Sequence, residues 1–123
     1  MDQPVQIQEI EIGSNRRTCD PALALRVQMD EAETYAVLFK ALSHPVRVQI
    51  LDLISQGQGE TCACDIERHF ELTQPTISHH LKVLRDAELI TSESHGVWVH
   101  HRVNPAKVTA LRHLLATMEN NSG

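Results

Sequence analysis

The stretch LTQPTISHHLKVLRDAELI, residues 72–90, decides the fold of this chain of 123 residues. Thr73 is a suitable N-cap for a helix, and Pro75 fits the first helical turn because its missing N–H is not needed there. Three apolar residues then recur at helical spacing, namely Ile77, Leu81 and Leu84. The stretch predicts a helix over residues 74–88 with one narrow apolar stripe and a broad polar surface.

A shorter helix is predicted immediately before it, from about Cys62 to Phe70, with Ile66 and Phe70 buried. Only residues 71–73 would connect the two helices. Two helices joined by so short a turn, the second with polar groups beside an apolar stripe, are typical of a helix-turn-helix motif.

After Leu89 the residue pattern changes from that of a helix to that of strands. The segments LITSES and VWVHHRV are rich in β-branched residues and flank His95-Gly96, which predicts a β-hairpin with its tip at these two residues. A hairpin that directly follows a helix-turn-helix motif is a wing.

The helices outside this unit complete the expected architecture. Asp30, with Glu33 three residues on, has the spacing of a capping box and would start the first helix. Asn104-Pro105 would start a last amphipathic helix whose apolar residues share one face: Val108, Leu111, Leu115 and Met118. The expected fold is mainly α with a small β-hairpin, a winged helix-turn-helix in which the first and last helices form the seam of a dimer.

We divide the chain into three parts. Residues 1–29 form an N-terminal arm that carries Cys19 and has a suitable start for a short helix at Asp20. Residues 30–119 form the winged helix-turn-helix domain for DNA binding and dimerisation, and residues 120–123 form a C-terminal tail.

The composition bounds the class of protein. A chain with 41% hydrophobic and 22% charged residues is an ordinary globular domain, and its scarce aromatic residues favour helices packed on helices. The sequence has neither an apolar run of about 18 residues nor a signal-peptide pattern, so we expect a cytoplasmic protein that does not associate with membranes. In that reducing compartment, three cysteines indicate thiols that bind or react rather than a disulfide framework.

The polar surface of the central helix is suited to DNA, although the chain has a net charge of −5. Between Gln74 and Arg85 there are two cations and no acid. Its outward side chains can donate hydrogen bonds to phosphates and base edges: Gln74, Thr76, Ser78, His79, Lys82 and Arg85. In the wing, His95 and Trp98 lie near the tip and Arg102 lies at the base. An ordinary solvated helix is the plainer interpretation, but the adjoining short helix and hairpin favour DNA binding.

One such unit contacts one half-site of DNA. We therefore expect a homodimer on double-stranded operator DNA with an imperfect inverted repeat, the two recognition helices lying one helical turn of DNA apart. The small number of cations predicts few phosphate contacts and a modest non-specific affinity.

These segments together resemble a known family. FKALSHPVRVQILDLI (residues 39–54), QPTISHHLKVLRDAELI (residues 74–90) and HGVWVHHRV (residues 95–103) are similar to the corresponding motifs of the ArsR/SmtB family of bacterial winged-helix metalloregulators. The resemblance covers roughly residues 30–118. It implies a homodimeric repressor of an operon that releases its DNA when a metal ion or metalloid binds. It also implies that five residues of the central helix face the DNA: Gln74, Thr76, Ser78, His79 and Lys82.

The stretch ETCACD, residues 60–65, is similar to the family's Cys-x-Cys-Asp effector motif. The start of a helix favours the thiolate forms of Cys62 and Cys64, which are the forms that bind metals. Residues two apart do not share a face of a regular helix. We therefore expect that both sulfurs reach one ion only if the first helical turn loosens, which would move the helix that supports the recognition helix.

The number of thiols indicates the effector. As(III) and Sb(III) are soft ions that three thiolates satisfy, whereas Zn(II) or Cd(II) ordinarily takes four ligands. In the arsenic-sensing branch a third cysteine lies three residues past the pair, where this chain has Glu67. Another branch, which senses cadmium and lead, adds cysteines from an N-terminal arm, and Cys19 is similarly placed. We predict a site of Cys19, Cys62 and Cys64 for As(III) or Sb(III). A fourth ligand would make it a site for Cd(II), Pb(II) or Zn(II).

Other functions fit less well. An enzyme is not expected, because no His-Glu-x-x-His helix and no local nucleophile motif is present. A thiol redox switch remains an alternative; a disulfide between Cys62 and Cys64 would be strained, so Cys19 would be the better partner for either. A DNA-binding protein without an effector, in which the two cysteines are merely small buried residues, is the remaining alternative.

Overall fold

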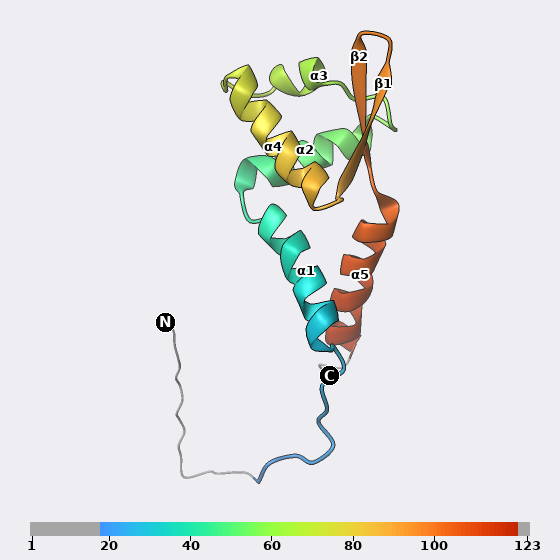
Figure 1. Cartoon of the computed structure of the whole chain (residues 1–123). Coiled ribbons are helices and arrows are strands. Elements are labelled where there is room, and N and C mark those ends of the chain that lie inside the picture. Colours follow the sequence, from blue (N-terminus) through green and yellow to red (C-terminus); the bar gives the residue numbers. More distant parts are fainter. Residues whose placement is uncertain (1–17, 121–123) are drawn as a thin grey trace.

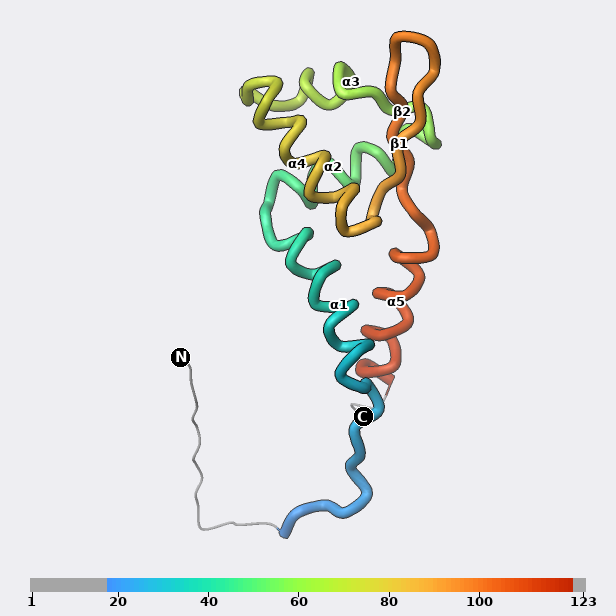
Figure 2. Tube along the Cα trace, in the orientation of Figure 1, coloured from blue at the N-terminus to red at the C-terminus, as the bar shows by residue number. Residues whose placement is uncertain are grey.

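The computed structural model describes residues 18–120, which form a winged helix-turn-helix (Figure 1). Its elements follow in the order α1 (Met29–Ala41), α2 (Pro45–Gln56), α3 (Ala63–Glu67), α4 (Gln74–Asp86), β1 (Ile90–His95), β2 (Trp98–Val103) and α5 (Pro105–Asn120). Helices α1 and α5 lie side by side at one end, and the other helices and the hairpin form the opposite end (Figure 2). The expected fold class, mainly α with a small β-hairpin, is confirmed.

The core joins the helix-turn-helix to its supporting elements. Its fully buried side chains come from helices α1 to α4, the loop after α4 and the first strand: Leu38, Ile50, Ile54, Ile66, Ile77, Leu84, Leu89 and Ile90. The predicted apolar stripe of α4 is buried throughout. In α5, Leu111 and Leu114 are buried, whereas Leu115 and Met118 stay about half exposed. The apolar face of α5 is therefore only partly used within one chain.

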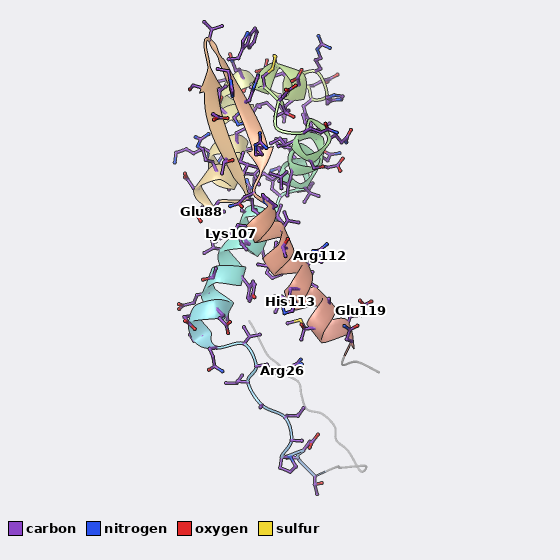
Figure 3. All side chains as sticks on the ribbon, turned by 90° about the vertical axis from the view of Figure 1, so that its right-hand side faces the viewer. Arg26, Glu88, Lys107, Arg112, His113 and Glu119 are labelled. Atoms are coloured by element: carbon purple, nitrogen blue, oxygen red, sulfur yellow. A yellow bond between two sulfur atoms is a disulfide. The ribbon has the colours of Figure 1, made fainter. Side chains whose placement is uncertain are left out.

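Helix α4 begins at Gln74, as its sequence predicts, and ends at Asp86, two residues before the predicted end. The Thr73 side chain accepts a hydrogen bond from Thr76 N at 3.3 Å, which confirms the N-cap. The helix stops at Asp86 because Glu88 takes a left-handed conformation with φ of 63°. At this point α5 is attached, because Lys107 Nζ lies 3.5 Å from Glu88 Oε1 (Figure 3).

The wing is a two-stranded antiparallel hairpin. Its register runs from Ile90 opposite Val103 to His95 opposite Trp98, so the turn consists of Gly96 and Val97. The predicted tip is therefore displaced by one residue. Gly96 has a φ of 65°, a conformation that suits glycine in a tight hairpin turn.

Two predictions for the N-terminal region are wrong. Helix α1 begins at Met29, with Gln28 N donating to Glu31 Oε1 at 3.1 Å, so the capping box lies two residues before the expected one. The expected short helix after Asp20 is a turn, in which Ala22 N donates to the Asp20 carboxylate at 2.9 Å. A short helix needs an apolar face to pack, and the leucines of this segment are about four-fifths exposed.

The remaining predictions for the chain ends, at residues 1–17 and 121–123, lie outside the described residues. Within residues 18–120, none of the helices is long and apolar enough to cross a membrane.

Candidate effector site and DNA-binding surface

The two neighbouring cysteines lie at the start of α3. Cys62 is the N-cap, with an extended backbone (φ −100°, ψ 167°), and its N–H donates to Asp65 Oδ2 at 3.0 Å. Cys64 lies in the first helical turn. Because Cys62 lies just outside the helix, the two side chains share one side although they are two residues apart. The expected loosening of the first turn is therefore not needed to bring the sulfurs together.

Cys62 and Cys64 form a disulfide in this structure. The prediction that Cys19 is the better partner for a disulfide is wrong here, whereas the ligand role of the two thiols in the reduced state stays a prediction. The N-cap conformation of Cys62 explains the difference, because it places the two Cα atoms 5.3 Å apart, within the usual range for a disulfide.

Asp65 joins the two cysteines as a third potential ligand. The sulfurs of Cys62 and Cys64 and a carboxylate oxygen of Asp65 all lie within 4.8 Å of one another, and residues 18–120 contain no other such group of His, Cys, Asp or Glu. Cys64 and Asp65 are exposed and Cys62 is partly buried, so an ion can enter from solvent. In the reduced state, two thiolates on one side fit a soft ion, and a third soft ligand must come from elsewhere.

Cys19 is not part of this group within one chain. It is a free, exposed cysteine in the segment of residues 18–28, which extends from the N-terminal end of α1. This segment and α3 lie at opposite ends of the molecule (Figure 1). The structure therefore does not bring Cys19 to Cys62 and Cys64 in one subunit, and its role as a ligand stays a prediction.

The polar residues predicted to meet DNA form the outer surface of α4. Five of them are exposed: Gln74, Ser78, His79, Lys82 and Arg85. Thr76 is partly buried, and its hydroxyl bonds to the N-cap hydroxyl of Thr73 at 2.9 Å. Lys82 Nζ lies 2.7 Å from Asp86 Oδ2, and this hydrogen bond holds the pKa of Asp86 below its usual value. The acidic partner of Lys82 was not predicted from the sequence.

His80 faces inward from α4 beside the exposed His79. Its Nδ1 lies 3.3 Å from Arg47 Nη1, and its ring lies 4.6 Å from that of His44. Burial lowers the pKa of His80, as do the charges of His44, Arg47 and His79. Arg47 also donates to Ala41 O at 2.6 Å, so this arginine connects the end of α1 to the recognition helix. No local sequence pattern indicates this role of Arg47, because its partners lie on other elements.

The outer part of the wing, residues 93–99, is exposed. His95 stacks on His100 with ring centroids 4.7 Å apart, and its Nε2 lies 3.2 Å from Glu93 Oε1. Trp98 is 55% exposed near the tip. Arg102 lies at the base, as expected, with its guanidinium group against Gly59 of the α2–α3 loop. Both His95 and Arg102 are exposed, and Arg102 also lies beside the loop; their contacts with DNA stay a prediction.

Residues 44–92 match the family model described as "bacterial regulatory protein, arsR family". An arsenical resistance operon repressor of Bacillus subtilis is 41% identical over 88 residues, which cover 68% of this chain and 83% of that protein. The chain belongs to the ArsR family. An arsenical resistance operon repressor of Staphylococcus xylosus is 51% identical over 61 residues, although the match spans only 57% of that protein.

The fold of this ArsR-family chain also matches solved structures. The homodimeric winged helix-turn-helix domain Mb0332 of Mycobacterium bovis superposes with a TM-score of 0.60 at 21% identity, over 85% of this chain and 94% of that domain. In this ArsR-family chain, α3 and α4 are the helix-turn-helix and β1–β2 is the wing. The protein is accordingly a DNA-binding transcriptional regulator and not an enzyme.

Proposed function

We propose that this ArsR-family protein is a homodimeric repressor that leaves its operator when As(III) or Sb(III) binds Cys62 and Cys64. The observation that carries the proposal is the position of the two sulfurs, side by side at the start of α3, the helix that packs against α4. The similarity to arsenical resistance operon repressors supports the choice of ion. We propose that the protein's partner is double-stranded operator DNA with an imperfect inverted repeat. Because that DNA lies in the cytoplasm, the repressor would act there.

Exposed apolar residues on α1 and α5 support the dimer. Three of them are about half exposed, namely Val37 of α1 and Leu115 and Met118 of α5. Exposed apolar side chains on two helices that lie side by side support a surface that a partner covers. A second copy that packs α1 and α5 against the same helices would bury them and pair two recognition helices. The homodimeric M. bovis domain has the same fold.

A dimer also offers the third thiolate. Cys19 lies far from Cys62 and Cys64 in its own chain, so we propose that Cys19 of the partner subunit completes the site. Each As–S bond forms as a thiol replaces a hydroxide of arsenous acid, and the thiol proton leaves with that hydroxide as water. If Asp65 or a water supplied a fourth ligand, the same site would suit Cd(II), Pb(II) or Zn(II).

In the DNA complex we propose direct contacts from the exposed residues of α4 and from the wing. These are Gln74, Ser78, His79, Lys82 and Arg85, with Thr76 at the first turn, and His95 and Arg102 in the wing. Residues 30–119 would form the binding and dimerisation unit, with the preceding segment as the arm.

Fluorescence anisotropy of labelled DNA from upstream of the protein's own gene tests the proposal. Reduced protein is bound and then titrated with arsenite, cadmium and zinc in parallel. We expect arsenite to release the DNA at the lowest concentration, and a Cys62→Ser, Cys64→Ser variant to bind DNA without responding. Release by cadmium or zinc alone would mean that a fourth ligand exists, and an unchanged response after Cys19→Ser would exclude the three-thiolate site.

The Cys62–Cys64 disulfide favours a second candidate function, a thiol redox switch. Hydrogen peroxide would oxidise the two thiols to the disulfide and would itself be reduced to water. Release of DNA by peroxide without any metal, reversed by dithiothreitol, would support this function over metalloid sensing. Cys19→Ser would leave that response intact, because the oxidised pair is complete without Cys19.

A further inference from the structure

The loop that precedes the effector cysteines is attached to the wing. His101 N donates to Thr61 O at 2.8 Å, which forms an isolated β-bridge at the edge of β2 opposite β1. Both residues are buried, with 5% of Thr61 and 4% of His101 exposed. Cys62 directly follows Thr61. The backbone of the effector motif is therefore continuous with a strand-like contact on the wing.

One further contact connects the loop and the wing, and two others fix Thr61 and His101 on their own sides of the bridge. The Arg102 guanidinium lies against Gly59, where an added Cβ would come within 2.6 Å of Nη2 and where φ is +88°. The Thr61 hydroxyl packs against Gly57 so closely that an added Cβ would overlap it. On the far side, His101 Nδ1 lies 2.8 Å from Ser92 Oγ of β1. A displacement of Thr61 would therefore reach both strands of the wing.

Ligand binding is expected to displace the loop side of the effector motif, which is the side attached to the wing. A dithiol such as dithiothreitol first reduces the Cys62–Cys64 disulfide to two thiols and is itself oxidised to a disulfide. An ion that then binds both thiolates fixes the two sulfurs at a separation different from that of the S–S bond. On the helix side, Ile66 of α3 is fully buried in the core, which resists movement of the helix. On the loop side, Cys62 is extended and precedes the helix. The displacement should therefore fall on Cys62 and Thr61.

We propose that Thr61 and His101 are positioning residues that transmit the state of Cys62 and Cys64 to the wing. The wing, and not only α4, then changes its position on DNA when the effector binds. This inference rests on the proposed function for the identity of the effector, but the bridge itself is independent of which ion binds.

Trp98 provides a direct readout, because it is the only tryptophan of the chain and lies in β2. Arsenite is titrated into the reduced protein while Trp98 emission, thiolate–arsenic absorbance in the ultraviolet and DNA anisotropy are recorded. We expect the emission to change with the same midpoint as DNA release. Amide hydrogen exchange in residues 98–103 should also increase, because the His101 N–H loses its acceptor.

Gly57→Ala is the test variant, because it displaces the Thr61 hydroxyl and leaves all three cysteines in place. Arsenite absorbance should be retained, whereas the coupling between arsenite and DNA should fall by about fivefold or more. The matched control is Ser55→Ala, at an exposed residue of α2 two positions before Gly57, whose hydroxyl bonds to Asp52 O of its own helix. It should keep both the Trp98 response and DNA release.

The outcomes separate the two proposals. If arsenite releases DNA while Trp98 emission and exchange of residues 98–103 stay constant, the signal passes through α4 alone and this inference is wrong. A folded Gly57→Ala protein with an unchanged Trp98 response would also overturn it; if the variant does not fold, the exchange measurement on the natural chain decides. If arsenite neither binds nor releases DNA, the proposed function fails, and the Trp98 response to reduction of the disulfide then decides the coupling.

Discussion

His80 is a buried histidine on a helix whose other polar side chains mostly face solvent. Arginine has no acceptor, so Arg47 donates to Nδ1 and the proton of the neutral ring belongs on Nε2. A second proton on His80 would place a buried cation beside Arg47. Burial lowers the pKa of His80, and the neighbouring charges of His44, Arg47 and His79 add to this effect.

This arrangement predicts that the domain loses stability as the pH falls below His80's ordinary pKa of 6.5. In the unfolded chain His80 takes up a proton near that pH, whereas in the folded chain it does so only at lower pH, so acid favours unfolding. Burial, with a smaller contribution from Arg85, lowers the pKa of His101 and gives the same sign. Urea unfolding at pH 7.5 and 5.5 should show a smaller loss for His80→Gln than for the natural chain.

The control for that measurement is His79→Gln, because His79 is the exposed neighbour on the same helix. It should change the pH dependence much less than His80→Gln does, because the charge of His79 is the smallest of the causes that lower the pKa of His80. Equal slopes for the two variants would mean that His80 does not carry the effect.

At the scale of the elements, local sequence patterns were sufficient where local contacts decide the structure. The N-cap of α4 at Thr73 and its buried stripe follow from side chains within a few residues of one another. The start of α1 could not be predicted as well, because Gln28 and Asp30 offer competing capping boxes and only packing chooses between them. The disulfide was missed because it depends on whether Cys62 lies inside the helix or is its N-cap.

Lys82 and Asp86 form an ion pair, and we predict that replacing each of them has opposite effects on the affinity for DNA. Lys82→Ala should weaken binding to all sequences and lower the slope of log affinity against log salt by about 1. Asp86→Asn should instead strengthen binding by about two- to fivefold, because Lys82 is released and an acid is removed from the surface. Anisotropy over a salt series measures both. Weaker binding by Asp86→Asn would show that the ion pair positions Lys82 on the phosphate.

At the scale of the whole molecule, contacts between distant segments decide what the sequence could not indicate. The bridge from Thr61 to His101 joins backbone groups, which carry no residue signature. Cys19 is exposed in a segment at the opposite end of the molecule from α3, so counting thiols could not assign it to a subunit. Conversely, Leu115 and Met118 were predicted on one face of the last helix, and their exposure now shows which part of that face is available to a partner.

Leu115→Glu should convert the protein from a dimer to a monomer. Leu115 is 52% exposed on α5, and a buried charge in a two-fold seam would occur twice. Sedimentation equilibrium should give the mass of one chain, and operator affinity should fall by about tenfold or more because one recognition helix reaches only one half-site. Thr109→Glu, an exposed position about a third of a turn around the same helix from Leu115, is the control and should stay dimeric. A dimeric Leu115→Glu protein would place the seam on another surface, and the proposal that Cys19 of the partner subunit completes the effector site would then lose its geometric basis.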